Sequence, residues 1–413
     1  MPQFNRLWGA GACSGLGAEI GELALPSLAL LTLGATAAEA SWVRAALLAP
    51  FLLLTLWLGV LVDRCRRRPL MLVADIGRGA ILALVCVLAL FDRLGVPALI
   101  VATFGLGTLT VLYQLADFSF VPHIVPERHL IDANAKITAT QSAISITGTG
   151  VGGTLVQLLT APFAVAANAL GYLASATLIG RIRVHEERPA RAGRGRVVAE
   201  ARAGLRVLRR HRVLRALVAE ASVWNLGNEI LMLALAVHVL DGAAAGPLVL
   251  GIILTCGGAG SFIGSLCSSR LTARHGYGPS LLASLVLGNS APFLGVLVVL
   301  GGPPAVEVPV LCAAFLASGA GSGVANSQSS SIRQLAVPGE LRGRVNAGYR
   351  LLSWGALSIG ALAGGLLTTA AGPLRAAALG ALVMAAATLP VLWSPVRRVR
   401  AIQDVAAGST QPG

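Results

Sequence analysis

The chain has 413 residues, of which 55% are hydrophobic and only 12% are charged, and its formal net charge is +14. Soluble globular proteins carry about 25% charged residues, so this composition excludes a soluble fold. Nucleic-acid binding is disfavoured as well, because the basic residues lie between apolar blocks rather than on one soluble face.

The apolar residues come in blocks of about 20, which is the number that a helix needs to cross the hydrocarbon layer of a membrane. A membrane β-barrel would instead show alternating segments of about 10 residues. We therefore predict an all-α integral membrane protein with twelve transmembrane helices. Their ranges are roughly 12–34, 43–62, 70–91, 97–121, 137–159, 162–182, 216–240, 247–269, 279–300, 307–330, 347–370 and 374–394.

The distribution of basic residues predicts the orientation of the chain. If the two tails and every second loop share one compartment, that compartment holds all of the 32 Lys and Arg residues except Arg44, Arg93 and Arg375. Basic loop residues stay on the cytoplasmic side of membrane proteins. We therefore expect a multi-pass protein of the cell (cytoplasmic) membrane with both termini in the cytoplasm.

An internal repeat predicts two related halves. The pattern Leu-Gly-x-Glu-Ile-x-x-Leu-Ala-Leu at 16–25 returns at 226–235. On the fifth and eleventh helices the repeated glycines are Gly148, Gly152 and Gly153, then Gly360, Gly364 and Gly365. Such glycines permit close packing of membrane helices. Duplicated six-helix units are common in transporters, with the substrate site between the halves.

The predicted domains follow from this repeat. They are an N-terminal six-helix half at 1–182, a basic cytoplasmic linker at 183–215, a C-terminal six-helix half at 216–395 and a cytoplasmic tail at 396–413. Leu and Val recur at helical spacing between Arg residues over 204–218, which suits an amphipathic helix on anionic lipid. We favour the other interpretation of this segment, a solvated linker on the positive-inside side of the membrane.

A few ionisable residues fall inside the predicted spans. Glu19 and Glu22 share one face of helix one, and Glu229 on helix seven is the repeat-mate of Glu19. Ionisable side chains at membrane depth normally face a partner or a watery cavity. We interpret these three as candidates for proton coupling or for binding a cationic group of the substrate. The alternative is that they bond to neighbouring helices or face the cytoplasmic vestibule.

Other polar residues are assigned by position. Asn326 and Gln328 on helix ten are candidates for lining the cavity toward the cytoplasm. Asp75 and Arg78 are three residues apart, which predicts an intrahelical pair. Glu220 lies about one helical turn from the cytoplasmic end of helix seven, and we interpret it as interfacial.

The loop after helix two reads Gly59-Val-Leu-Val-Asp63-Arg64, followed by a run of arginines. With twelve spans and the repeat, it resembles the signature loop of the major facilitator superfamily. The resemblance implies a conformational latch formed by Gly59, Asp63, Arg64 and Arg67. In that family the Asp meets the start of helix eleven and the later Arg pairs with an acid on helix four, which is Asp117 here. Arg66 stands where the family usually has Gly.

Two further segments resemble exporters of this superfamily. The run Gly-Thr-Gly-Val-Gly-Gly at 148–153 resembles the exporters' Gly-Pro-rich signature, with Thr149 in place of Pro. The segment 333–350, with Arg333-Gln334 and Leu-Arg-Gly-Arg-Val-Asn-Ala at 341–347, is similar to the branch of enterobactin-type siderophore exporters and macrolide-efflux proteins.

These observations predict a secondary active efflux transporter. Its substrate would be a small amphipathic organic molecule, such as a drug, antibiotic or siderophore-like compound, exported by proton antiport and alternating access. An uptake symporter or a facilitator is the alternative. We expect no enzyme, since HExxH, P-loop and aspartate-rich diphosphate motifs are missing from the sequence. The loops are too short for the extramembrane domain of a receptor. We expect no cofactor or metal, a monomer, and substrate, protons and membrane lipid as partners.

Overall fold

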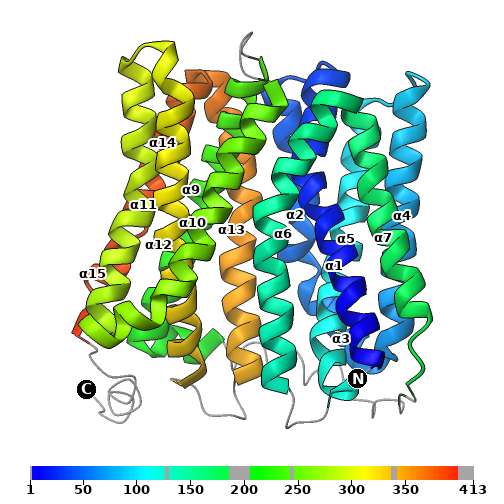
Figure 1. Cartoon of the computed structure of the whole chain (residues 1–413), viewed down its shortest axis with the longest axis horizontal. Helices are drawn as coiled ribbons and strands as arrows, with labels where there is room; N and C mark the ends of the chain where they lie inside the picture. Colours follow the sequence, from blue (N-terminus) through cyan, green and yellow to red (C-terminus); the bar gives the residue numbers. More distant parts are fainter. Residues whose placement is uncertain are drawn as a thin grey trace. The chain divides into compact units, whose positions relative to one another are not determined.

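The computed structural model describes residues 2–125, 130–184, 186, 205–241, 246–335 and 342–398, and the regular structure in these ranges is helical (Figure 1). The first helices are α1 (Pro2–Ser27), η1 (Leu28–Thr32), α2 (Ala37–Leu53), α3 (Thr55–Arg64), α4 (Arg67–Leu90), α5 (Val96–Ile124), α6 (Leu130–Leu159) and α7 (Ala161–Gly180). A short helix at 205–210 precedes α9 (Arg212–Asp241) and α10 (Gly246–His275). The last helices are α11 (Tyr277–Gly301), η3 (Pro304–Val306), α12 (Glu307–Leu335), α13 (Arg342–Ala371), α14 (Pro373–Ala386), α15 (Leu389–Leu392) and η5 (Pro395–Arg398).

Among the described residues, 9 helices are long and apolar enough to cross a membrane. They comprise α4, α5, α7 and the helices from α9 to α14. Large apolar side chains on these helices, such as Val101, Leu170 and Leu366, are exposed, which suits contact with lipid rather than water. The chain is therefore a multi-pass membrane protein, and the count of twelve spans stays a prediction.

The two predicted spans nearest the N-terminus are irregular helices. Pro26 lies inside α1, and the chain continues as the π-helical turn Leu28–Thr32. Pro50 lies inside α2, which ends at Leu53 before α3 begins at Thr55. A proline inside a helix removes one backbone hydrogen bond and bends the helix. The bends explain why neither segment forms one straight apolar rod.

Two compact units make up the chain. The first comprises Met1–Val197 and Val239–Thr255, and the second comprises Val198–His238 and Cys256–Gly413. In the first unit α1 packs on α6 and α7, and α4 packs on α5 and α7. In the second unit α11 packs on α12 and α14, and α14 also packs on α13. The stretch Val239–Thr255, at the junction of α9 and α10, belongs to the first unit although the sequence places it in the C-terminal half.

The glycines of helix α6 let it approach the backbone of α1. A β-carbon added to Gly148 would lie 2.5 Å from Cβ of Glu19, and one added to Gly152 would lie 3.1 Å from Cα of Ile20. Gly153 packs instead against the first turns of α10, where an added β-carbon would lie 2.8 Å from the backbone oxygen of Pro247. No side chain larger than hydrogen fits at these positions without a shift of the helices.

The second unit repeats this packing between α13 and α9. A β-carbon added to Gly360 would lie 3.0 Å from Cβ of Glu229, and one added to Gly364 would lie 3.1 Å from Cα of Ile230. Gly365 is buried as well. The repeated sequence pattern therefore corresponds to a repeated contact, in which each glycine helix meets the same face of its partner.

The amphipathic segment before α9 packs onto protein. Leu208, Val213, Leu214 and Leu217 are buried in an apolar cluster with residues of α11, α12, α13 and α15. The less favoured interpretation, an amphipathic helix with its apolar face on lipid, is therefore wrong for the described part, 205–218. Residues 187–204 of the predicted linker and 399–413 of the predicted tail lie outside the described residues.

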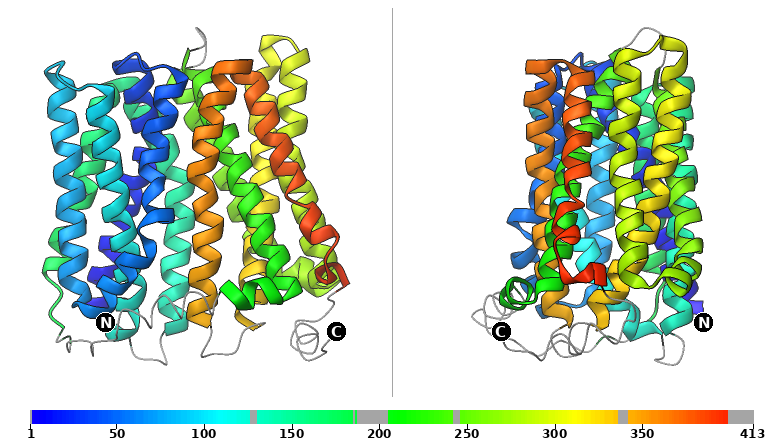
Figure 2. Two further views of the ribbon diagram at one scale, coloured as in Figure 1. Left: turned by 180° about the vertical axis from the view of Figure 1, so that it is seen from behind. Right: turned by 90° about the vertical axis from the view of Figure 1, so that its left-hand side faces the viewer.

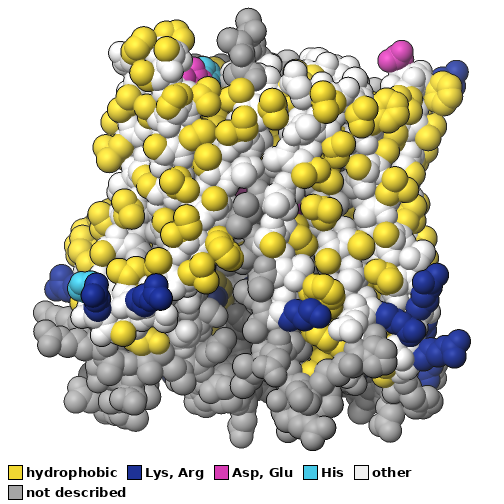
Figure 3. Space-filling model, in the orientation of Figure 1, with side chains coloured by type: hydrophobic (Ala, Val, Ile, Leu, Met, Phe, Trp, Pro, Cys, Tyr) yellow, Lys and Arg dark blue, Asp and Glu magenta, His cyan; other side chains and the backbone are white. Residues whose placement is uncertain are grey.

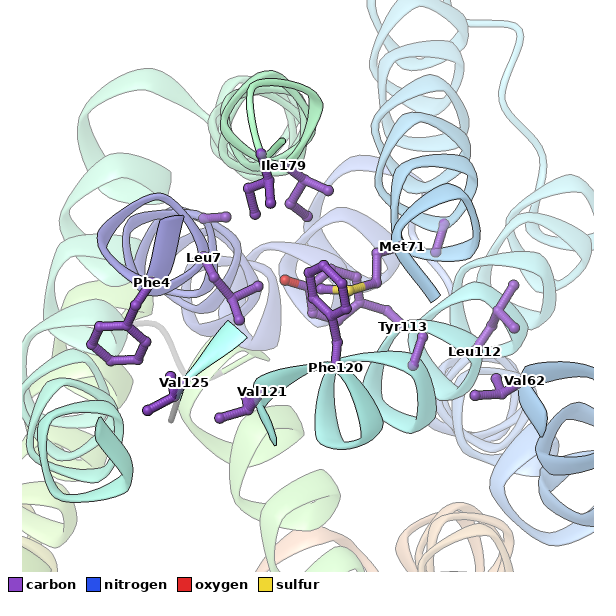
Figure 4. Close-up of a cluster of buried hydrophobic side chains, with 14 residues drawn as sticks. Phe4, Leu7, Val62, Met71, Leu112, Tyr113, Phe120, Val121, Val125 and Ile179 are labelled. Carbon is purple, nitrogen blue, oxygen red and sulfur yellow. The ribbon is translucent and has the colours of Figure 1, made fainter. Parts of the chain in front are cut away.

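The core of the first unit lies where α1, α4, α5 and α7 meet. Figure 4 shows Leu7, Met71, Phe120 and Ile179 pointing toward one another from these helices, and Phe4 belongs to the same buried cluster. On the face drawn in Figure 3, apolar side chains run along the helices, and Lys and Arg side chains gather mainly at the lower end.

Candidate functional site

A cavity of ≈ 380 Å³ opens among α9, α11, α12 and α13 in the second unit. Binding sites for small molecules typically measure about 300–1,000 Å³. The walls of this polar cavity are Leu217, Glu220, Ala221, Trp224, Asn225, Leu281, Leu285, Asn289, Ser322, Ala325, Asn326, Ser329, Arg333, Tyr349, Arg350, Ser353 and Trp354.

One carboxylate and two guanidinium groups face the polar cavity. Glu220 lies within hydrogen-bonding range of Asn289 and within electrostatic range of Arg333. The guanidinium of Arg333 stacks 3.8 Å above the ring of Tyr349. The guanidinium of Arg350 lies 4.2 Å from the ring centre of Trp354. Charged groups inside a membrane protein are costly, so their collection around one cavity makes this cavity the candidate functional site.

Hydrogen bonds between helices hold the walls of this cavity. Nδ2 of Asn225 on α9 donates to the backbone oxygen of Ser353 on α13 at 2.6 Å. Nδ2 of the buried Asn289 on α11 donates to Oγ1 of Thr388 at 3.1 Å. These hydrogen bonds between helices fix the positions of the polar groups in the wall. Trp224 and Trp354 add apolar surface beside them. Such a site can bind a molecule that is polar at one end and apolar at the other.

The two residues predicted to line the cavity have different positions. Asn326 is exposed and lines the polar cavity. Gln328 is buried, and its Nε2 donates to the hydroxyls of Thr272 and Ser280, each at 2.8 Å. Two residues along a helix turn a side chain by about 200°, so Asn326 and Gln328 face different ways and Gln328 ties α12 to α10 and α11.

Glu19 and Glu22 lie close enough to interact electrostatically on α1. Oγ of Ser145 on α6 donates to Glu19 at 3.3 Å, and Glu19 is half-buried. Glu22 forms an ion pair with Arg44 of α2 at 2.7 Å, and 48% of its side chain is exposed. The two carboxylates therefore differ, since Glu22 already has a cation partner.

Glu229 belongs to the second unit and is buried, with 3% of its surface exposed. It lies against Gly360, as Glu19 lies against Gly148. The convergence of the three carboxylates on one cavity stays a prediction.

A buried charge cluster in the first unit includes the predicted pair of Asp75 and Arg78 on α4. Arg78 donates to Asp75, and both side chains are buried. The guanidinium of Arg78 lies 4.4 Å from the ring centre of Tyr113 and 4.1 Å from that of Tyr172. Asp117 of α5 lies within electrostatic range of Asp75 and Arg78. One cation thus serves two carboxylates between two aromatic rings.

The signature loop is held by Glu186, which the sequence analysis did not single out. Glu186 is 6% exposed and accepts hydrogen bonds from the backbone N–H groups of Arg67 at 2.6 Å and Arg68 at 3.0 Å. These are free donors at the start of α4, where a carboxylate is favourable. The guanidinium of Arg68 donates to the backbone oxygens of Ile179 and Gly180 at the end of α7. The loop is therefore tied to the segment that follows α7.

The predicted latch pair is absent among the described residues. No ion pair joins Arg67 to Asp117, and Nε of Arg67 has no hydrogen-bond partner there. The reason is geometric, because Asp117 meets α4 at Asp75, which lies eight residues, or about 12 Å, beyond Arg67. Gly59 has open space where its β-carbon would be, so close packing does not explain it. The side chain of Asp63 lies outside the described residues, and Arg64 ends α3.

Sequence reasoning therefore missed Glu220 and Glu186 as functional candidates. The depth of Glu220 in the membrane stays a prediction, and the structure adds that Arg333 and Tyr349 line the same cavity and cover it. The signal that marks it is the resemblance of 333–350 to exporters, since Arg333 and Arg350 of that segment both reach the polar cavity.

The sequence pattern of one family covers nearly the whole chain. The family described as transmembrane secretion effector matches residues 1–411. The chain belongs to this family. No curated protein matches this member of the transmembrane secretion effector family.

Solved transporters share the fold of this secretion-effector chain. A bacterial homologue of the iron transporter ferroportin, in an inward-facing state, superposes with a TM-score of 0.75 at 15% identity over 94% of this chain and 98% of that chain. The nucleoside transporter NupG gives 0.75 at 10% identity over 94% and 99%. A bacterial homologue of the human lysosomal transporter Spinster gives 0.67 at 13% identity over 99% and 97%. These similarities show the fold alone, and it is the major facilitator fold.

Proposed function

We propose that this member of the transmembrane secretion effector family is a secondary active exporter of a small amphipathic organic molecule. It would work by proton antiport and alternating access in the cell membrane, with both termini in the cytoplasm. The polar cavity of ≈ 380 Å³ is the observation that carries this proposal. It joins charge and aromatic surface inside a membrane-spanning unit, and the description of the family supports secretion.

The polar cavity favours one kind of substrate. Arg333 and Arg350 supply two positive charges, and Glu220 supplies one negative charge. Trp224 and Trp354 offer flat apolar surface next to these charges. A molecule with an acidic group and an apolar ring system satisfies both features, because guanidinium groups bind oxyanions in a planar, two-pronged geometry. Drugs, antibiotics and siderophore-like compounds include such molecules.

The proposed coupling residues remain Glu19, Glu22 and Glu229, to which we add Glu220. Glu19 and Glu229 are the stronger pair, since each is packed against a glycine of a neighbouring helix at equivalent positions of the repeat. Glu22 is the weakest candidate, because Arg44 neutralises it at 2.7 Å. A coupling carboxylate must bind a proton in one state and release it in another, which requires a surrounding that changes during transport.

Substrate-driven proton flux in proteoliposomes tests the proposal. Acid-loaded vesicles holding the wild-type protein and an internal pH indicator would be screened with siderophores, macrolides and hydrophobic cations. We expect at least one acidic amphipathic compound to release luminal protons. The variants R333Q and R350Q should lower the apparent affinity for that compound by about tenfold each, the loss of one charged hydrogen bond.

The coupling residue is identified in the same vesicles with carboxylate variants. We expect one of E19Q, E229Q or E220Q to bind substrate and lose proton release, while E22Q stays near the wild type. E307Q is the matched control, because Glu307 does not line the polar cavity. Its carboxylate pairs with His238 at a distance of 2.8 Å. If substrate instead moves down its own gradient without proton flux in every variant, the protein is a facilitator. If it enters together with protons, the protein is an uptake symporter.

A further inference from the structure

A second cavity, of ≈ 660 Å³, lies in the second unit where the start of α9 meets the segment from α15 to η5. We name it the arginine cavity, after Arg212, Arg215 and Arg397 in its wall. Trp393 belongs to the same wall and is 76% exposed. It shares no residue with the polar cavity, and the function proposed above makes no use of it.

The three guanidinium groups of the arginine cavity have no acidic partner among the described residues. All three side chains are exposed, and none forms an ion pair with any carboxylate in the part of the chain that the structure describes. Arg212 and Arg215 are three residues apart in the first turn of α9, so they share one face. Positive charge at the start of a helix is unfavourable, because the free N–H groups there are already positive. Two arginines at this position therefore call for a bound anion to offset them.

The walls of the arginine cavity are fixed by packing on both sides. On one side, Val213 and Leu214 are buried next to the two α9 arginines, and on the other, Val391 and Val396 are buried next to Trp393 and Arg397. All four apolar residues belong to the same cluster. In Figure 2 the start of α9, in green, and the red segment of α15 and η5 lie at the same end of their unit. The arginines are thus presented by a rigid frame.

From the length of α9 we expect the arginine cavity to lie at the depth of lipid headgroups. The spanning stretch Arg212–Leu240 has 29 residues, which is more than the roughly 20 that cross the hydrocarbon layer. Its first turn therefore projects into the headgroup region, on the side that the basic residues predict to be cytoplasmic. Tryptophan is enriched at this interface, where its ring contacts acyl chains and its N–H contacts headgroups.

We propose that the arginine cavity binds the headgroup of an anionic phospholipid. The phosphate would be held by Arg212, Arg215 and Arg397, and the glycerol and upper acyl chains would lie against Trp393, Pro390 and Pro395. A free phosphate ion has the same charge chemistry, but it would leave the exposed indole and the two prolines without a partner. Basic pockets between membrane helices bind anionic lipid headgroups in other membrane proteins.

Lipid binding by the full-length protein tests this proposal. Delipidated protein in detergent would be titrated with phosphatidylglycerol and with phosphatidylcholine, and bound lipid counted by native mass spectrometry. We expect phosphatidylglycerol to bind at least about tenfold more tightly, a difference of about 1.4 kcal/mol. The cavity variant carries R212Q, R215Q and R397Q. The matched control carries R206Q, R209Q and R210Q, which removes the same charge from the exposed face of the neighbouring helix.

We expect the cavity variant to lose the preference for phosphatidylglycerol and the control variant to keep it within about twofold. Equal losses in the two variants, or no preference in the wild type, would overturn the proposal, because a diffuse basic surface explains both results. Inorganic phosphate at millimolar concentration separates the two sources of the anion. If it displaces the lipid completely, the site binds a soluble anion and the proposal is wrong.

Fluorescence gives a second measurement that does not depend on affinity. Phosphatidylglycerol with brominated acyl chains should quench the wild-type emission more than that of W393F, because Trp393 would lie against the chains. Brominated phosphatidylcholine should show no such difference. Equal quenching of the wild type and W393F by the anionic lipid would place the lipid elsewhere and contradict the assignment.

Discussion

Thr160 and Gly372 occupy equivalent positions in the two halves and share one backbone conformation. Thr160 precedes α7 with φ 80° and ψ 162°, and Gly372 precedes α14 with φ 84° and ψ 158°. This region of backbone angles is almost restricted to glycine, because a β-carbon clashes with the chain there. The second half has the residue that suits the turn, and the first half has one that does not.

Replacing Thr160 by glycine should therefore stabilise the protein. Strain of this kind costs about 1–3 kcal/mol, and the substitution removes it. Glycine loses more conformational entropy on folding than threonine does, which reduces the gain by about 0.5–1 kcal/mol. We expect a gain near 1 kcal/mol, measured as a higher Tm in detergent. T160A keeps the β-carbon and is the control, for which we expect no gain.

The reverse change tests the same argument in the second half. A β-carbon on Gly372 would meet no atom within 4 Å, so G372A adds backbone strain without a steric clash. We expect Tm to fall in G372A. An unchanged Tm in both T160G and G372A would show that these turns relax freely and carry no strain.

Glu186 provides the next prediction, because it accepts two backbone hydrogen bonds at the start of α4. Removing a charged helix cap costs about 1–2 kcal/mol, so E186A should lower Tm. E186Q should cost less, since it keeps an oxygen that accepts one bond. The free thiol of Cys65 lies next to the loop and reports on it directly. We expect faster alkylation of Cys65 in E186A, and an unchanged rate would mean that the loop is held by other contacts.

Much of the fold was predictable because it depends on short-range patterns. Hydrophobic blocks predicted the 9 described helices that are long and apolar enough to cross a membrane, and the spacing of Gly148 and Gly152 identified the face of α6 that packs on α1. Contacts between distant helices were not predictable in the same way. The sequence offered Arg67 as a partner of Asp117, yet eleven residues further along the same helix Arg78 is the cation within its range. A pattern along one helix does not determine which turn of another helix lies opposite.

The candidate site shows the same limit. Asn326 and Gln328 are equally polar, and their different directions follow from the rotation of α12 about its axis, which polar spacing alone does not reveal. Glu220 was assigned to the interface from its distance to the helix end. The walls that enclose it come from α12 and α13, more than 100 residues away in the chain. Depth in the membrane and burial in the protein are therefore separate quantities.

Packing of Gly148 against Glu19 predicts a functional effect of a small substitution. The added methyl group of G148A would lie 2.5 Å from Cβ of Glu19, so the helices or the carboxylate must move. If Glu19 couples protons, G148A should reduce substrate-driven proton release while substrate still binds. G360A makes the same test for Glu229, where the corresponding distance is 3.0 Å. Normal proton release in both variants would remove these glutamates from the coupling mechanism.

The hydrogen bond between His211 and the first turn of α9 is sensitive to acid. Nδ1 of His211 accepts a hydrogen bond from the backbone N–H of Leu214 at 3.4 Å, which requires a neutral ring. Burial lowers the pKa of His211 below its usual 6.5. Below pH 6.5 the imidazole of the unfolded chain is protonated more fully than that of the folded chain. The free energy of unfolding therefore falls as the pH drops from 6.5 toward the lower pKa of the folded protein. We expect the Tm of the wild type to fall more than the Tm of H211N when the pH is lowered from 7.5 to 5.5. A pH-independent difference would contradict this role.

The buried pair of Asp75 and Arg78 allows structural and functional roles to be separated. R78A removes the cation and leaves Asp75 buried without a counter-charge, which costs about 3–5 kcal/mol. R78K should recover only part of that loss, because an ammonium group does not stack between the rings of Tyr113 and Tyr172 as a planar guanidinium does. Tm in detergent measures both effects.

The double variant D75N/R78A then decides what the pair does. Removing both charges avoids the uncompensated carboxylate, so its Tm should lie well above that of R78A. If transport in vesicles also returns, the pair serves the packing of α4 alone. If Tm recovers while transport stays lost, the charges act in the transport cycle, and Asp117, which shares the cation, becomes the residue to vary next. A double variant no more stable than R78A would show that the aromatic stacking, rather than charge pairing, holds this part of the unit together.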